Sequence, residues 1–148
     1  MKIKTLFISA ALLVLVALSS ISNVNAAVTP VYGSVVVNGE TLNFEAKPIV
    51  LNGNTMVPFR QIFEAMGMGV EWNNETKTVT ATKADLAIKM TPDNFKASVN
   101  DKEYTLTQTP FVTPEGIFYV NLRFISEAAG ATVSWDNINK VATIDTEA

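Results

Sequence analysis

Residues 57–72 read Val-Pro-Phe-Arg-Gln-Ile-Phe-Glu-Ala-Met-Gly-Met-Gly-Val-Glu-Trp, and residues 120–135 read Val-Asn-Leu-Arg-Phe-Ile-Ser-Glu-Ala-Ala-Gly-Ala-Thr-Val-Ser-Trp. The second segment repeats the first at a constant offset of 63 residues. The shared positions include Arg60 and Arg123, Glu64 and Glu127, Gly67 and Gly130, and Trp72 and Trp135. An internal duplication of this kind predicts two similar units that pack together.

Tight turns predict β-hairpins on both sides of each motif. Asn38-Gly39 and Asn52-Gly53 each separate two short apolar runs, and both dipeptides accept positive φ. The second unit has comparable turns at Asn100-Asp101 and at 114–116. The expected strands cover 35–37, 41–44, 49–51, 55–57, 70–72, 78–82, 85–90, 97–99, 104–106, 111–112, 117–120, 131–135 and 141–144.

Each motif also predicts a short helix. Pro58 suits the first helical turn, and Gly67 supplies the left-handed residue that commonly ends a helix. Ile62, Phe63 and Met66 share one face between them, which we expect to be buried. The second helix is expected over 121–129.

One such unit cannot cover both its helix stripe and its sheet face, so the two units are expected to share a core. The sequence therefore predicts an α+β fold of antiparallel β-hairpins with two short helices. The repeat units, about 31–82 and 97–145, would form one domain with a pseudo-twofold internal repeat. The order of the strands stays open at this point.

The first 26 residues have the pattern of a signal peptide. Lys2 and Lys4 precede an apolar run from Leu6 to Leu18, and Ala26 ends a small-residue cleavage site. We expect cleavage there, a mature domain at 27–148, and a secreted or cell-surface protein. The alternative is an uncleaved anchor, although the apolar run is shorter than the roughly 20 residues of a spanning helix.

Composition excludes several kinds of chemistry. The chain has no histidine and no cysteine, so the usual ligands of copper, zinc and iron-sulfur centres are missing, as is the usual base of a serine nucleophile. Without Lys2 and Lys4, nine basic residues stand against 14 acidic ones, and no basic stripe suggests a nucleic-acid partner. We expect no metal and no cofactor.

The duplicated motif, Val57-Pro58-Phe59-Arg60 through Trp72 and again at 122–130, resembles the copper amine oxidase N-terminal domain-like family. The resemblance covers about residues 35–145 and implies a small secreted or cell-surface bacterial module that carries neither the copper site nor the quinone cofactor of the oxidases. Asn121 stands where the family often has proline, a departure that concerns how the second helix begins.

Arginine near a helix start opposes the helix dipole, so its double occurrence calls for a reason. We expect Arg60 to pair with Glu64 and Arg123 with Glu127, or each arginine to bind loop carbonyl oxygens, and so to pin its helix to the sheet. Ligand binding is the alternative.

Trp72 and Trp135 each lie two residues after a valine and are expected in the core, although exposed aromatics could also stack on carbohydrate. The aromatic residues that break the repeat are the better surface candidates for binding, and they are Tyr104, Phe118 and Tyr119.

Three functions remain open. The first is a non-catalytic module that binds the cell wall, an envelope polymer or another extracellular protein. The second is a small hydrolase of envelope glycan, which would need two clefted carboxylates about 5–9.5 Å apart. The third is a structural subunit of a surface matrix, which would need open sheet edges. The first is the interpretation that we favour, so we expect no enzyme.

Overall fold

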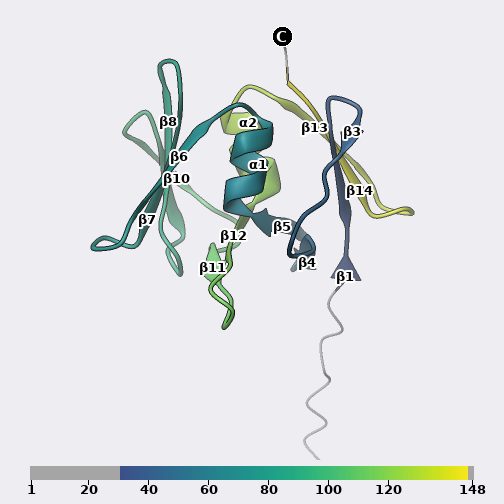
Figure 1. The fold of residues 1–148 in the computed structure, drawn as a ribbon, viewed down its shortest axis with the longest axis horizontal. Coiled ribbons are helices and arrows are strands. Elements are labelled where there is room, and N and C mark those ends of the chain that lie inside the picture. The colour runs from purple at the N-terminus through teal and green to yellow at the C-terminus, as the bar shows by residue number, and fades with distance from the viewer. Residues whose placement is uncertain (1–30, 147–148) are drawn as a thin grey trace, which may run out of the picture.

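A computed structural model describes residues 31–146. Two sheets flank a central layer in which two short helices lie beside a third sheet (Figure 1). The expected signal peptide, residues 1–26, lies outside the described residues.

The central sheet contains one hairpin from each unit, and both helices follow directly from it. Its strand order is β1-β4-β5-β12-β11. The strands are β1 (Val31–Tyr32), β4 (Ile49–Leu51), β5 (Asn54–Pro58), β11 (Phe111–Val112) and β12 (Phe118–Asn121). Helix α1 (Phe59–Ala65) follows β5, and helix α2 (Leu122–Ala128) follows β12.

The first flanking sheet is antiparallel throughout, with the order β10-β9-β8-β7-β6. Each strand pairs with the next in sequence, as expected for a meander. Its strands are β6 (Gly69–Asn73), β7 (Thr78–Lys83), β8 (Leu86–Met90), β9 (Lys96–Val99) and β10 (Lys102–Thr105).

The second flanking sheet joins the two ends of the described chain, with the order β13-β14-β2-β3. Its strands are β2 (Ser34–Val37), β3 (Glu40–Thr41), β13 (Thr132–Asp136) and β14 (Val141–Asp145). Strands β14 and β2 run parallel, with Ala142 opposite Val35 and Ile144 opposite Val37. Sequence patterns predict β2, β13 and β14, but the strand expected at 41–44 is instead β3, which ends at Thr41. They do not predict the parallel pairing of β14 with β2.

The two units meet where β5 pairs with β12. Val57 lies opposite Val120, Pro58 opposite Tyr119, and Met56 opposite Asn121. Val57 and Val120 are both fully buried and occupy equivalent positions in the two copies of the motif.

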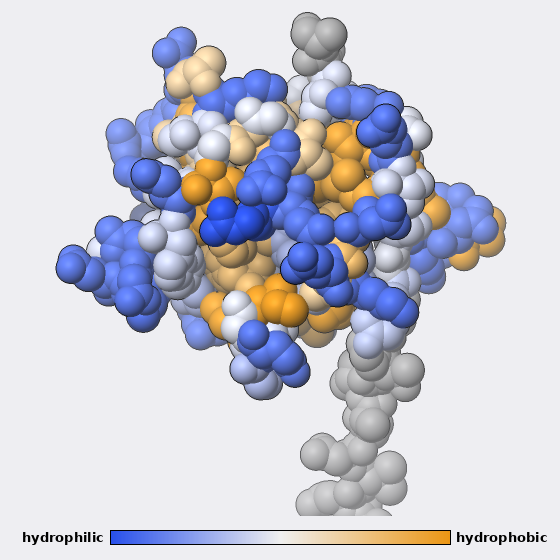
Figure 2. All heavy atoms as spheres, in the orientation of Figure 1, coloured by the Kyte–Doolittle hydropathy of each residue, from blue (hydrophilic) through white to orange (hydrophobic). Residues whose placement is uncertain are grey.

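The core is formed by both units. Ile62, Phe63 and Met66 of the first helix region are buried as predicted, and Ile125 of α2 is fully buried. Branched residues of both flanking sheets, such as Val79 and Ile144, complete the same cluster. In the space-filling view, hydrophilic residues cover most of the outer sheet edges, while apolar surface shows over the central layer (Figure 2).

The α+β class is confirmed, and the turn residues act as expected. Asn38 and Gly39 have φ of 51° and 83°, and Asn52 and Gly53 have φ of 49° and 75°, so both predicted hairpin turns are left-handed. Gly67 (φ 73°) and Gly130 (φ 80°) follow the ends of the two helices.

Candidate functional site

Trp72 in the first unit packs against two phenylalanines. Its ring centroid lies 5.7 Å from that of Phe118 and 6.5 Å from that of Phe59, and the two phenylalanine rings are 5.4 Å apart. Aromatic contacts at these separations each stabilise the fold by about 0.5–1.5 kcal/mol beyond area burial. The space beside Trp72 is therefore filled by the chain's own side chains.

The expectation that both tryptophans are core residues is wrong for Trp72, which is 37% exposed. Trp135 is partly buried and packs against the core. The reason is topological, because β6 and β13 are edge strands and leave one side of each ring without a neighbouring strand.

Phe118 and Tyr119 do not lie on the surface, so that expectation is also wrong. Both are 3% exposed, and they lie on β12, an interior strand of the central sheet between β5 and β11. The Tyr119 hydroxyl donates to the Lys47 carbonyl oxygen over 3.0 Å, and its ring stacks on Phe111 at 5.1 Å. Burial raises the pKa of the Tyr119 hydroxyl, with smaller contributions from nearby Tyr32 and Glu115.

Tyr104 is the third of these candidates and is accessible. It is 38% exposed, and its ring makes an edge contact with Phe124 at 6.0 Å. Its part in binding stays a prediction.

Three residues near Trp135 are smaller or more polar than their counterparts at an offset of 63. At the offset of 63, Leu122 takes the place of Phe59, Thr55 that of Phe118, and Asn54 that of Ile117. All three replacements line a cavity of about 400 Å³ beside Trp135. Side chains fill the space beside Trp72, whereas the space beside Trp135 is open.

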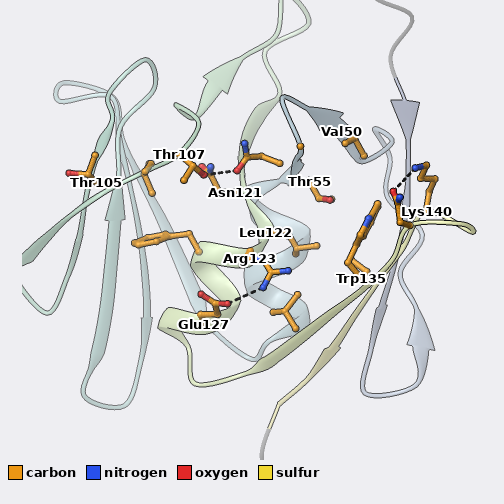
Figure 3. Close-up of a pocket in the computed structure, with 17 residues that line it drawn as sticks. Val50, Thr55, Thr105, Thr107, Asn121, Leu122, Arg123, Glu127, Trp135 and Lys140 are labelled. Carbon is orange, nitrogen blue, oxygen red and sulfur yellow. Dashed lines mark hydrogen bonds and ion pairs between the residues drawn. The ribbon is translucent and has the colours of Figure 1, made fainter.

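We call this cavity the Trp135 groove. Its apolar lining includes Leu122, Phe124, Val133 and Trp135, and its polar lining includes Asn54, Thr55, Thr107 and Asn121. The charged side chains that line it are Arg123, Glu127 and Lys140. Figure 3 shows Trp135 and Lys140 at one end of the groove, Thr105 and Thr107 at the other, and the first turn of α2 between them.

Arg123 comes from that first turn. Its Nη1 lies 3.3 Å from Glu127 Oε1, and in the first unit Arg60 Nη1 lies 3.9 Å from Glu64 Oε1. All four side chains are more than half exposed, so the pairs add little to stability. The two arginines differ in their surroundings, because the Arg60 guanidinium lies 5.4 Å from the Phe59 ring whereas Arg123 has Leu122 at that position.

Asn121 is a buried polar residue in the groove lining. It is 4% exposed, and its Nδ2 donates to the Gln108 carbonyl oxygen over 2.9 Å, which ties the 107–109 segment to the start of α2. Among the described residues, nothing donates to its Oδ1. The residue is the N-cap of α2, yet its side chain makes no capping bond.

The backbone at Gly33 passes close to Trp135 and to the Lys140 carbonyl oxygen. A Cβ at Gly33 would lie 3.1 Å from the Lys140 carbonyl oxygen and 3.5 Å from Trp135 Cη2. Ser34 N also donates to that carbonyl over 2.9 Å. The segment from Gly33 to Ser34 thus positions both Trp135 and Lys140 at their end of the groove.

The described residues offer little for catalysis or for metal binding. Every Asp and Glu within 31–146 is exposed, and Glu127 is the single carboxylate that lines the groove. Within the same range, His, Cys, Asp and Glu side chains nowhere form a group of three that could hold a metal ion. Neither α1 nor α2, at seven residues each, is long enough to cross a membrane.

The described residues form a small α+β domain with a groove beside Trp135. A model of the copper amine oxidase N-terminal domain matches residues 36–144, so the chain belongs to that family. This domain is a non-catalytic accessory domain in copper amine oxidases. No curated protein matches the chain.

Proposed function

We propose that this protein is a non-catalytic, secreted or cell-surface binding module, and that it binds through the Trp135 groove. Its partner is the cell wall, an envelope polymer or another extracellular protein. The non-catalytic character of the family domain supports this proposal, and so does the signal-peptide pattern of residues 1–26.

The observation that carries the proposal is the difference between the two copies of one structural motif. Phe59 and Phe118 fill the space beside Trp72, whereas Leu122 and Thr55 leave it open beside Trp135. An unfilled cavity costs stability, since its lining lacks partner atoms. A cavity of about 400 Å³ with a few converging polar groups is within the size range of ligand sites.

We propose that a pseudo-twofold relation makes the two units equivalent, so that the surroundings of Trp72 correspond to those of Trp135. The pairing of Pro58 with Tyr119 becomes the pairing of Asn121 with Met56 when both residues are shifted by 63 positions in opposite directions. Helix bounds support the same relation, because 59–65 shifted by 63 gives 122–128.

The hydrolase alternative receives less support. A glycosidase needs two carboxylates on either side of the scissile bond. Glu127 is the single carboxylate among the residues that line the Trp135 groove. Its side chain is 57% exposed and paired with Arg123.

The test is retention on cell-wall and secreted fractions of the producing organism. We expect the wild type to be retained and Trp135→Ala to lose retention by at least about tenfold. Trp72→Ala is the matched control, because it removes the same side chain from the equivalent strand without touching the groove. Thr55→Phe fills the groove with the residue type of its counterpart Phe118, and we expect it to lose retention while staying folded by circular dichroism.

The proposal is wrong if Trp135→Ala and Thr55→Phe both bind as the wild type does. Loss of retention in Trp72→Ala alone would move the binding site to the first unit.

A further inference from the structure

We infer that the Trp135 groove takes a sugar ring that carries a carboxylate, with the ring against Trp135 and the carboxylate at Arg123. This inference rests on the proposed function, since it names the class of ligand for the same groove.

The apolar part of the groove offers flat surfaces. Trp135 lines one end and is only partly buried, and Phe124 lines the groove from α2. The C–H face of a sugar ring packs against an indole ring, and aromatic side chains contribute much contact area at low entropic cost.

The polar part of the lining favours a sugar over an apolar peptide side chain. Thr55 and Asn54, the counterparts of Phe118 and Ile117 at the offset of 63, place hydroxyl and amide groups at the cavity wall. Thr107 lies beside them, and its Oγ1 donates to Asn54 Oδ1 over 2.6 Å. Sugar hydroxyls both donate and accept, which suits such groups.

The charge at the groove favours an anion. Arg123 and Lys140 line it against the single carboxylate of Glu127, although the whole chain has a net charge of −3. Lys140 Nζ lies 2.7 Å from the neutral Asn137 Oδ1, so its charge is not neutralised there.

Arg123 has the donors that a carboxylate needs. A guanidinium presents five N–H donors in a planar fork, and the contact with Glu127 Oε1 uses Nη1 at 3.3 Å. Arg60 has the same contact with Glu64, but its guanidinium also lies over Phe59, a ring that Leu122 does not offer to Arg123. The Arg–Glu pair thus occurs twice, and the pair that lines the groove is Arg123 with Glu127.

The experiment compares methyl β-D-glucuronide with methyl β-D-glucoside, which differ only in a carboxylate against a hydroxymethyl group. Binding is followed by the indole N–H signals of the two tryptophans in nuclear magnetic resonance spectra of the full mature chain. We expect the glucuronide to move the Trp135 signal, with a dissociation constant at least about tenfold lower than that of the glucoside. The Trp72 signal should stay in place.

Variants separate the roles of charge and shape. Arg123→Met should remove the preference for the glucuronide, and Arg123→Lys should retain part of it, since lysine keeps the charge but lacks the fork. Arg60→Met is the matched control and should bind as the wild type does. Arg123 is 63% exposed, so its replacement should leave the spectrum of the folded domain intact.

The outcomes distinguish this inference from the proposed function. Equal affinity for glucoside and glucuronide, or an undiminished preference in Arg123→Met, overturns the carboxylate inference. If neither sugar moves the Trp135 signal while wall or protein retention still depends on Trp135, the sugar inference is wrong and the binding module stands. If retention also fails, both are wrong.

Discussion

One buried polar group of the second unit lacks a hydrogen bond at a position where the first unit has an apolar side chain. Ser126 is fully buried in α2, and its Oγ has no partner among the described residues. The equivalent position of the first unit holds Phe63, which is fully buried in the core. A buried hydroxyl without a hydrogen bond lowers stability, because it gives up water and gains nothing in return.

Ser126→Ala should therefore stabilise the protein. We expect the free energy of unfolding to rise by about 1 kcal/mol, since the change removes an unpaired polar group and raises helix propensity. Guanidinium denaturation followed by circular dichroism measures the change. Ser134→Ala, at an exposed position of β13, is the control and should shift the midpoint far less. A lower midpoint for Ser126→Ala would show that the hydroxyl is satisfied in solution.

At the scale of elements, the sequence predicts most of the fold because the signals are local. Pro58 and Gly67 bracket the first helix, and Asn38-Gly39 takes the positive φ that its hairpin needs. The parallel pairing of β14 with β2 was not predicted, because alternation of apolar residues defines the buried face of a strand and not its neighbour.

The groove could not be predicted for a related reason. Under the proposed pseudo-twofold relation, Thr55 is the counterpart of Phe118, and that relation runs across the β5–β12 pair rather than along one element. The sequence signal lay in the positions where the two copies differ, above all Phe59 against Leu122. The aromatic residues that break the repeat are predicted to be surface groups, whereas Phe118 is buried and packs against Phe59 and Trp72.

The β13–β14 turn provides an acid-sensitive element. Asp136 Oδ1 accepts N–H bonds from Ile138 and Asn139 at 2.9 and 3.0 Å, and its Oδ2 accepts one from Asn139 Nδ2 at 2.7 Å. These bonds, those from Asn139 first, lower the pKa of Asp136 below its ordinary value. The β6–β7 turn has the neutral Asn73 in the same position, where it accepts two N–H bonds at 2.9 Å each.

Because the pKa of Asp136 is lowered in the folded state, its ionised form stabilises the fold at pH values above the unfolded-state pKa of about 3.9. This stabilisation is lost as the pH falls through the lower folded-state pKa. Asp136→Asn should keep the turn and reduce the loss of stability in acid. Urea denaturation from about pH 7 down to about pH 2 measures it. The reciprocal Asn73→Asp should increase the acid sensitivity. An Asp136→Asn profile parallel to that of the wild type would contradict this assignment.

At the scale of the whole molecule, stability depends on contacts between the two units. β14 needs β2 from the other end of the described chain, and the central sheet needs both β5 and β12. Neither unit keeps its hydrophobic cluster without the other, because residues of both, such as Phe63 and Ile125, belong to the same core. We therefore expect one cooperative unfolding transition rather than two.

The pairing of Val57 with Val120 tests this coupling directly. Opposed residues of antiparallel strands have Cβ atoms about 4.5–5.5 Å apart on the same face, and both valines are fully buried. Each single change to alanine should cost about 2–3 kcal/mol, and the double variant should cost less than the sum by about 0.5–1 kcal/mol, because each first change already removes the contact. Val57→Ala combined with Ile144→Val, in a different sheet, is the control and should be additive. Additivity for Val57 and Val120, or two separate transitions in denaturant, would mean that the two units fold independently.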